Sequence, residues 1–219
     1  MKNIKKIIFY GGTGQSKVMK TIAEYNNLEV LAVFDDTPNL KSPFNNLPIY
    51  YGNELENWVK SRNDVDEIGF CVSIGNPHGD ARLIIAQKLK SYGLTSISLI
   101  HPSAIIAKNS FIGEGVQVHA GAIIGEEVII GNQCIVNTKS SIDHECVLED
   151  GVEVAPNATL CGNITVKRCA TIFSSATILP NLIIGANAIV GANSLVNADV
   201  NQDIMVVGSP AKFLKKVSK

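Results

Sequence analysis

The sequence predicts a protein of the α/β plus all-β class, in which a small parallel sheet with helices precedes a long β-helix. Two observations carry this prediction. Up to about residue 100, short apolar runs alternate with helix-like stretches, and beyond it an aliphatic residue recurs at every sixth position. We therefore expect two domains, residues 1–100 and 101–219.

The first domain contains apolar runs typical of buried strands and amphipathic stretches typical of helices. The strand-like runs are KKIIFY, LEVLAVF and EIGFCVSI, and the helix-like stretches are KVMKTIAEYN and GDARLIIAQKLKSYG. This alternation predicts βαβ units and a small parallel sheet. Residues 97–100, ISLI, could form one more strand.

The second domain is defined by an unbroken period of six. In sixteen successive hexads one position is always aliphatic: Ile106, Ile112, Val118, Ile124, Ile130, Val136, Ile142, Leu148, Val154, Leu160, Val166, Ile172, Ile178, Ile184, Val190 and Val196. In a hexapeptide repeat three hexads form one triangular coil, the aliphatic residue points inward, and residues 18 apart stack in columns. Each coil buries its interior only against its neighbours, which predicts one cooperative solenoid of about five coils. An amphipathic helix is excluded because a period of six does not follow 3.6 residues per turn.

Composition excludes several kinds of partner. With 19 basic and 20 acidic residues the net charge is −1, which gives no electrostatic footprint for nucleic acid or an anionic membrane, so we expect a small substrate. The apolar run near the start, IIFY, is too short for a signal peptide or a membrane span. Five cysteines without a CxxC pair fit reduced thiols. These features predict a cytoplasmic protein.

Several short motifs occur in a specific order along the chain: FYGGTGQSKV, FDD, SIGN, HPSAII, NTKSSIDHECVLEDG and VVGSPAK. In this order, and over essentially the whole chain, they resemble the sugar acyltransferases of the PglD/NeuD type. The resemblance implies a Rossmann-like domain that binds a nucleotide sugar, followed by a left-handed parallel β-helix that binds acetyl-CoA. It also implies a homotrimer with active sites between neighbouring subunits.

A glycine-rich loop, Gly11–Gly14, follows the first predicted strand and precedes a helix. In that position backbone amides and a helix N-terminus can meet phosphate oxygens, although the loop could also be only a tight turn. About 100 residues supply one mononucleotide-binding half, so we expect a nucleoside diphosphate rather than NAD. Together with the resemblance, this predicts the nucleotide-sugar-binding residues Gly12, Thr13, Gly14, Asp35, Asp36, Gly75 and Asn76.

His144 stands between two acids in the hexapeptide region. It lies two places after the inward-pointing Ile142, so its ring should point outward at a corner, in one column with Glu126 and Gly162. An imidazole with a pKa near its usual ~6.5 can accept a proton near neutrality.

The resemblance implies that His144 and Glu145 form the catalytic His-Glu pair of the family. Glu145, or alternatively Asp143, would orient the ring. A backbone amide near Gly162 is the candidate donor to the oxyanion. Asn137 matches the family's NTSS-like segment and could orient the acceptor sugar, or it could belong to a structural asparagine ladder.

The acetyl-CoA site is expected along one column of the β-helix. Ser174, Ala192 and Pro210 lie 18 apart and leave a groove for the pantetheine arm. By resemblance, Lys212 in VGSPAK meets the adenine end; alternatively Pro210 ends the repeat and residues 212–219 are a solvated tail. The predicted acetyl-CoA-binding residues are Glu153, Gly162, Ser174, Ala192, Pro210 and Lys212.

Two positions depart from the family pattern. Gln15 stands where many relatives have histidine, so an acid-base role is excluded there. Glu153 replaces a histidine that contacts the acyl donor in better-known relatives. Because of this replacement, the geometry of the acyl-donor site near Glu153 cannot be carried over from those relatives.

These features are compatible with four functions. The leading one is acetyl transfer from acetyl-CoA to the amino group of a nucleotide-linked dideoxyamino sugar, which feeds O-antigen, other surface polysaccharide or glycoprotein assembly. The alternatives are O-acetylation of a sialic-acid-like sugar, a zinc hydratase of the γ-carbonic-anhydrase kind, and a non-catalytic nucleotide-binding scaffold. We expect no metal, because zinc needs three histidines and only His119 and His144 lie in the repeats. Apolar residues such as Phe173 and Leu179 hint at burial against another subunit.

Overall fold

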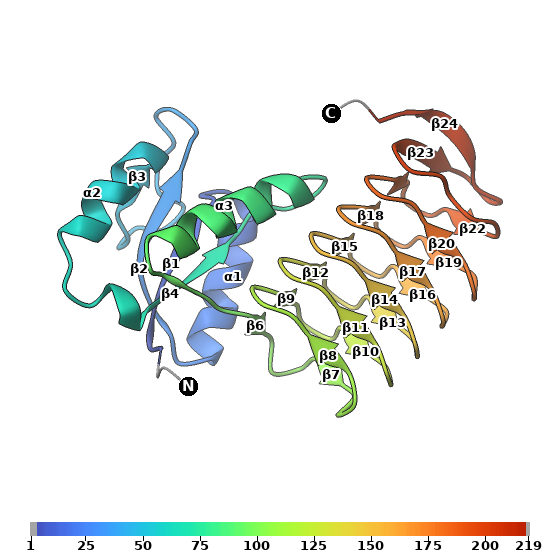
Figure 1. The fold of residues 1–219 in the computed structure, drawn as a ribbon, viewed down its shortest axis with the longest axis horizontal. Helices are drawn as coiled ribbons and strands as arrows, with labels where there is room; N and C mark the ends of the chain where they lie inside the picture. The colour runs from blue at the N-terminus through green and yellow to red at the C-terminus, as the bar shows by residue number, and fades with distance from the viewer. Residues whose placement is uncertain (1–3, 218–219) are drawn as a thin grey trace.

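The computed structural model describes residues 4–217 and divides the chain into two domains (Figure 1). A five-stranded parallel sheet with helices comes first, and a three-sided left-handed parallel β-helix follows. The predicted fold class is confirmed.

The N-terminal sheet has the strand order β3-β2-β1-β4-β5. Its strands are β1 (Lys6–Tyr10), β2 (Glu29–Asp35), β3 (Ile49–Tyr51), β4 (Ile68–Val72) and β5 (Thr95–Ser96). All four pairings between neighbours are parallel. Chain order reverses on the two sides of β1, and this is the point at which open α/β sheets bind ligands.

Helices cover both faces of this sheet. They are α1 (Gly14–Tyr25), α2 (Leu55–Lys60) and α3 (Gly79–Ser91), with short 3-10 segments at Gly52–Glu54 and Val65–Glu67. Alternate side chains of β1 belong to two cores: one packs Phe9 with residues of α1, and the other packs Ile8 with residues of α2 and α3. Both faces of the sheet are therefore buried, which explains the continuous apolar runs in the sequence.

Two differences from the sequence prediction have local causes. Helix α1 begins at Gly14, three residues before the predicted stretch, and the buried Ser16 hydroxyl in its first turn donates to the Thr13 carbonyl at 2.6 Å. The short elements β3 and α2 were not predicted, because three to six residues are too few to show a period.

The β-helix is built from two-residue strands on three faces. Face I consists of β7 (Ile105–Ile106), β10 (Ile123–Ile124), β13 (Ser141–Ile142), β16 (Thr159–Leu160), β19 (Thr177–Ile178) and β22 (Leu195–Val196). Face II consists of β8 (Phe111–Ile112), β11 (Ile129–Ile130), β14 (Val147–Leu148), β17 (Thr165–Val166) and β20 (Ile183–Ile184). Face III consists of β6 (Leu99–Ile100), β9 (Gln117–Val118), β12 (Ile135–Val136), β15 (Glu153–Val154), β18 (Thr171–Ile172), β21 (Ile189–Val190), β23 (Ile204–Val207) and β24 (Lys212–Lys216).

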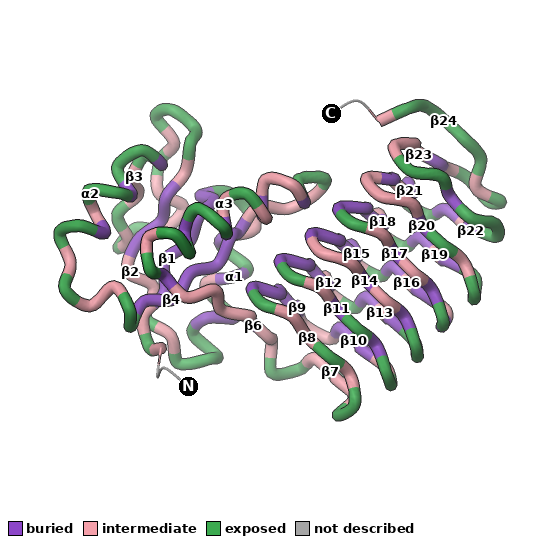
Figure 2. Tube along the Cα trace, in the orientation of Figure 1, coloured by how far each residue is buried: buried purple, intermediate pink, exposed green. Residues whose placement is uncertain are grey.

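The register of the β-helix agrees with the predicted columns. Ile124 pairs with Ile142, and Ile142 pairs with Leu160, so residues 18 apart stack. The stacked aliphatic side chains form one continuous core, and buried residues recur on every coil in Figure 2. The first strand, Leu99–Ile100, belongs to face III and precedes the range predicted for this domain by two residues.

The N-terminal domain packs on face III. The outward-pointing residues of its four central strands β9, β12, β15 and β18 are buried, namely Gln117, Ile135, Glu153 and Thr171. The corresponding residues of faces I and II include Ile123, Phe111 and Ile129, which are exposed. One face of the prism is thus covered within the chain, and two are open.

None of the helices in residues 4–217 has both the length and the apolar character needed to cross a bilayer.

We predict that Leu160→Ala destabilises the protein by about 2–5 kcal/mol, because Leu160 is fully buried between Ile142 and Ile178 and its loss leaves a cavity in the solenoid core. Urea unfolding measures the change. Thr159→Ala on the same strand, where the side chain points outward, is the control and should cost well under 1 kcal/mol. Equal losses in the two variants would contradict the inward assignment of the aliphatic column.

Candidate functional site

Three loops meet at the carboxyl edge of the N-terminal sheet. The amide of Gly11, after β1, donates to Phe34 of β2 at 2.7 Å, and the amide of Ser73, after β4, donates to Tyr10 of β1 at 2.7 Å. The predicted nucleotide-sugar residues lie in these loops, apart from Gly14 at the start of α1 and Asp35 at the end of β2. A Cβ added at Gly14 or Gly75 would meet nothing within 4 Å, so both glycines face open space.

The two aspartates at this edge already have protein partners. Asp35 accepts hydrogen bonds from the amides of Gly12 at 2.6 Å and Thr37 at 2.7 Å, and Asp36 accepts one from the hydroxyl of Tyr10 at 2.8 Å. Burial, together with the hydrogen bond to Asp36, raises the pKa of Tyr10. Both carboxylates therefore order the glycine loop and the strand ends, and their contact with a nucleotide stays a prediction.

The imidazole of His144 lies at the corner between faces I and II, exposed as predicted. Its Nδ1 lies 2.9 Å from Oε2 of Glu145, and both side chains are more than half exposed. The carboxylate of Asp143 instead accepts a hydrogen bond from the His144 backbone amide at 2.8 Å. Of the two neighbouring acids, Glu145 is thus the one that contacts the ring.

Gly162 lies directly above the histidine ring. The amide of Asn163 donates to the His144 carbonyl at 2.8 Å, and a Cβ added at Gly162 would stand 2.9 Å from Nε2 of His144. Gly162 also has a φ of +94°, which glycine adopts without strain. Its amide faces inward toward Cys146, where it opposes the rise in the thiol pKa caused by burial. The glycine therefore makes room for the ring, and its predicted role toward the oxyanion is untested.

The left-handed backbone of Glu145 is a property of the repeat. Its φ of 59° is matched one coil below by Glu127 at 58° and one coil above by Asn163 at 48°. Asn181, at 64°, continues the series, so the conformation belongs to this corner turn and is no sign of strain peculiar to the site.

Gln15 connects the two domains. Its Nε2 donates to Oε1 of Gln117 at 2.7 Å and lies 3.1 Å from Nε2 of His119, while Nε2 of Gln117 donates to the Val72 carbonyl at 2.7 Å. Because an amide nitrogen can only donate, Nε2 of His119 accepts and the ring is neutral. Burial lowers the pKa of His119 to about 4. Gln15 thus holds a neutral histidine at the seam between the domains.

A buried charge pair lies further along the same seam. Arg82 of α3 is fully buried, and its Nη1 lies 3.4 Å from Oε2 of Glu153, which is 2% exposed. Burial raises the pKa of Glu153, and Arg82 opposes the rise. Neither Arg82 nor Gln117 was predicted as a site residue, since a single polar residue in a helix or strand carries no pattern. Contact of Glu153 with acetyl-CoA remains a prediction.

Asn137 lies at the corner between faces III and I, beside this seam. Its amide donates to the Val154 carbonyl at 2.9 Å, and its side-chain oxygen accepts from the Thr138 amide at 2.8 Å. The residues 18 positions away are His119 and Ala155, so Asn137 belongs to no asparagine ladder. Such a pair exists elsewhere in the β-helix, where Asn163 donates to Asn181 at 2.7 Å.

The structure does not bring all predicted site residues together within one chain. Asn137 precedes β13 and His144 follows it, so the two side chains lie at the two ends of that strand on face I. The N-terminal domain covers face III, which His144 does not border. The nucleotide edge and the exposed imidazole therefore belong to different sides of the prism.

The predicted acetyl-CoA column lies at the corner between faces III and I. The Asn193 amide donates to the Ser174 carbonyl at 3.0 Å, and Ala192 and Pro210 are exposed. Lys212 begins β24, which runs antiparallel to β23, so residues 212–216 form a strand rather than a free tail. The alternative of a solvated tail also included residues 218–219, which lie outside the residues that the structure describes.

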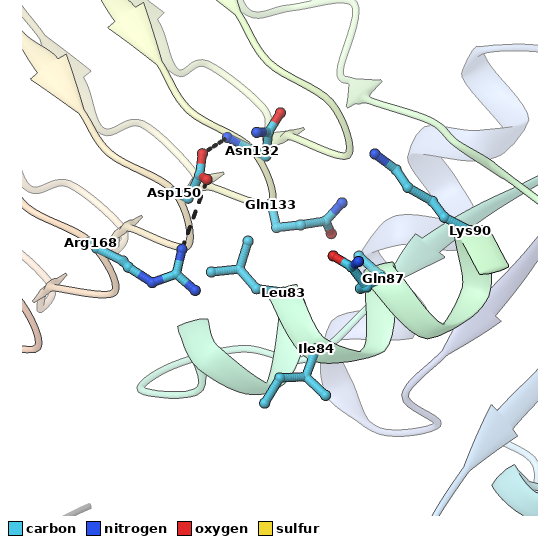
Figure 3. A pocket seen from close by; sticks show the side chains of 9 residues that line it. Leu83, Ile84, Gln87, Lys90, Asn132, Gln133, Asp150 and Arg168 are labelled. Carbon is cyan, nitrogen blue, oxygen red and sulfur yellow. Dashed lines mark hydrogen bonds and ion pairs between the residues drawn. The ribbon is translucent and has the colours of Figure 1, made fainter.

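A separate cavity of about 400 Å³ lies between α3 and the corner of faces II and III (Figure 3). Leu83, Ile84, Gln87 and Lys90 of α3 line one side, and Asn132, Gln133, Asp150 and Arg168 line the other. None of the predicted site residues lines it. Within residues 4–217, no group of three His, Cys, Asp or Glu side chains could hold a metal ion.

Two family models match the chain. Residues 6–89 match the PglD N-terminal domain, and residues 103–138 match the bacterial transferase hexapeptide repeat. Each of the two domains thus matches one of these models over part of its length. The predicted resemblance to the PglD/NeuD-type sugar acyltransferases is thereby confirmed.

Similar proteins extend the comparison. The UDP-N-acetylbacillosamine N-acetyltransferase of Bacillus subtilis (strain 168) is 32% identical over 118 residues, 53% of this chain and 52% of that protein. This match spans about half the length of the curated relative.

Solved structures match nearly the whole chain. PerB from Caulobacter crescentus, in complex with CoA and GDP-perosamine, has a TM-score of 0.87 at 27% identity and covers 96% of this chain and 97% of its own. The acetyltransferase domain of PglB from Neisseria gonorrhoeae FA1090, in complex with acetyl coenzyme A, has a TM-score of 0.85 at 25% identity. The match covers 96% of this chain and 100% of the PglB domain. The likeness therefore includes both domains.

We predict that Gly162→Ala displaces the His144 ring, because the added Cβ would stand too close to Nε2. The substitution should also lower the free energy of unfolding by about 1–2 kcal/mol, because alanine is strained at the positive φ of this position. A crystal structure of the variant, read at the Nδ1–Glu145 distance, and urea unfolding measure the two effects. Gly121→Ala is the matched control, because Gly121 has a φ of +67° but its nearest side-chain neighbour is Lys139. An unmoved imidazole in Gly162→Ala would contradict the prediction.

A second prediction concerns acid stability. The folded-state pKa of His119, about 4, lies below its unfolded value of 6.5, so the folded state binds fewer protons between these pH values. Stability should therefore fall as the pH drops from 6.5 to 4, by roughly 3 kcal/mol from this group. Denaturant unfolding at pH 7 and pH 4.5 measures it, with His119→Gln as the comparison. If the variant loses as much stability on acidification as the wild type, the buried neutral histidine is not responsible.

Proposed function

We propose that this protein is an acetyl-CoA-dependent N-acetyltransferase that acts on the amino group of a nucleotide-linked dideoxyamino sugar. The observation that carries the proposal is the similarity over 96% of the chain to an N-acetyltransferase with CoA and GDP-perosamine bound. The exposed His144–Glu145 pair supplies the chemistry that such a reaction needs.

His144 acts as the general base. Glu145 accepts a hydrogen bond from Nδ1, which places the proton there and leaves the Nε2 lone pair, beside Gly162, available to the sugar amine. The neutral amine nitrogen attacks the thioester carbonyl carbon, a C–N bond forms, and the proton lost by nitrogen passes to Nε2. Collapse of the tetrahedral intermediate breaks the C–S bond, and the imidazolium returns the proton to the departing sulfur.

The acetyl group passes directly between the two substrates. Burial raises the pKa of Cys146 and of Cys161, the thiols of the coils around His144, which disfavours the thiolate that an acyl carrier would need. A direct transfer requires both substrates at once, so we infer a ternary complex.

The carboxyl edge of the N-terminal sheet holds the nucleotide. The open space at Gly14 and Gly75 and the N-terminus of α1 favour a diphosphate there. Asp35, Asp36 and Asn76 complete the proposed set with Gly12 and Thr13. Acetyl-CoA is proposed to bind along the corner between faces III and I, where it is held by Ser174, Ala192, Pro210 and Lys212.

The active unit is a homotrimer. Faces I and II carry exposed apolar residues, among them Phe111, Ile123 and Ile129, which favours burial against another copy. Leu179 is 37% exposed and Phe173 is half-buried. Because His144 does not border face III, a neighbouring subunit would bring its nucleotide edge to this histidine. We place the enzyme in the cytoplasm, where acetyl-CoA and nucleotide sugars for surface-polysaccharide assembly are available.

The alternatives have less support. O-acetylation of a sialic-acid-like sugar would use the same fold, but the Bacillus subtilis relative and the perosamine enzyme of Caulobacter crescentus are N-acetyltransferases. A zinc site is disfavoured because His119 is buried against Gln15 while His144 is exposed at another corner. A non-catalytic scaffold would have no need for an oriented, exposed imidazole.

We predict that the protein releases CoA thiol when acetyl-CoA is combined with one of the UDP-, GDP-, dTDP- or CMP-linked amino sugars. His144→Ala should lower kcat by at least about a hundredfold, the usual scale for a general base, with little change in either KM. His101→Ala is the matched control, because His101 lies outside the proposed site, where its ring contacts Ser103 and Tyr25. Turnover only with a free hydroxylated sugar would refute N-acetylation, and normal turnover in His144→Ala would refute the base.

A further inference from the structure

Arg82 joins the two domains through buried hydrogen bonds. Its Nε donates to the Gln133 carbonyl at 2.9 Å and its Nη2 to the Gly151 carbonyl at 2.8 Å, both on the β-helix. Its Nη1 donates to the Ile74 carbonyl at 3.2 Å, in the loop that follows β4. One side chain therefore fixes the loop carrying Gly75 and Asn76 against the β-helix.

The remaining partner of Arg82 is Glu153. The Nη1–Oε2 distance is 3.4 Å, and the two side chains are 0% and 3% exposed. Glu153 lies on β15 and points outward from face III into the seam. A buried ion pair is a poor way to gain stability, because packed apolar residues of similar volume do as well. Its presence calls for another explanation.

Two asparagines flank the Glu153 carboxylate, one from each domain. Asn137 is held in the adjoining turn by its 2.9 Å hydrogen bond to Val154, the residue after Glu153. Asn76 lies two residues after Ile74, whose carbonyl accepts a hydrogen bond from Arg82. Asn137 and Asn76 both lower the pKa of the Glu153 carboxyl against the effect of burial, which places an asparagine of each domain near it. Glu153 thus lies between two residues that the sequence analysis connects with the sugar substrate, Asn76 and Asn137.

We propose that Arg82 and Glu153 are positioning residues for acetyl transfer: Glu153, held by Arg82, sets Asn76 of the N-terminal domain and Asn137 of the β-helix in one register. The inference rests on the proposed function, because it takes Asn76 and Asn137 to contact the nucleotide sugar. It assigns the acid at position 153 to the acceptor side of the reaction, through the two amides.

The physical reason lies in the precision that transfer requires. A substrate held by residues from two domains is misplaced when the domains shift, and a displacement of about 1 Å can cost a hundredfold in rate. A hydrogen-bonded charge pair is directional, whereas an apolar contact at the same seam would permit sliding. The pair thus limits movement of the ligand loop along face III.

The test is a double-mutant cycle between Glu153→Gln and Asn137→Ala. Glu153→Gln keeps the side-chain volume and removes the charge. It should lower kcat/KM for the nucleotide sugar at least about tenfold and leave KM for acetyl-CoA unchanged. In the Asn137→Ala background Glu153→Gln should cause little further loss, because we propose that Glu153 acts by holding the turn that carries Asn137. Losses that multiply, or an unaffected single variant, would overturn the proposal.

Two further variants serve as controls for the double-mutant cycle. Arg82→Lys keeps the charge but cannot reach three carbonyls and a carboxylate together, so it should reproduce the kinetic defect if Glu153→Gln does not fold. Glu149→Gln removes one partner of the exposed pair with Lys167, 2.9 Å apart, and should leave both kinetic constants unchanged. Thermal melting of each variant establishes that it is folded.

A structural readout separates this inference from the proposed function. Failure of the wild type to acetylate any nucleotide sugar would refute the function. In that case crystal structures of the wild type and Glu153→Gln decide the positioning role by themselves. Displacement of the Asn76 or Asn137 amide in the variant supports it, and two unmoved amides overturn it.

Discussion

The buried aliphatic side chain at every sixth position is the contact on which the rest of the molecule depends. Its column fills the interior of the prism and ties each coil to the coil 18 residues away, as in the pairing of Ile124 with Ile142 and Leu160. That register puts Gly162 over His144. It also sets Asn137 beside Val154, so the chemistry of the corners follows from the packing of the core.

The seam between the domains obeys a different physical rule. Face III is covered by polar as well as apolar groups, and Gln117, Arg82 and Glu153 are buried there with hydrogen-bonding partners. Such groups are costly to bury unless they are paired, so they specify one arrangement of the domains more strictly than an apolar seam would. The open faces I and II by contrast expose large apolar side chains, among them Phe111 and Ile123.

Much of the fold was predictable because it repeats. The period of six identified the inward residues, the columns and the outward direction of His144, and continuous apolar runs identified β1, β2 and β4. The short elements β3 and α2 escaped because they are too brief to show a period. The choice between Asp143 and Glu145 also needed coordinates, since adjacent residues differ only in where the turn directs their carboxylates.

By itself the sequence determined the two-domain class, the coil register and the residues stacked at each corner. These features follow from the local periodicity of apolar residues and from the burial of those residues. Tertiary structure alone decided which face of the prism the N-terminal domain covers. It brought Gln15 to His119, and Arg82 to Glu153, across separations of 104 and 71 residues. Contacts of that range depend on how two finished domains dock, and no short stretch of sequence records them.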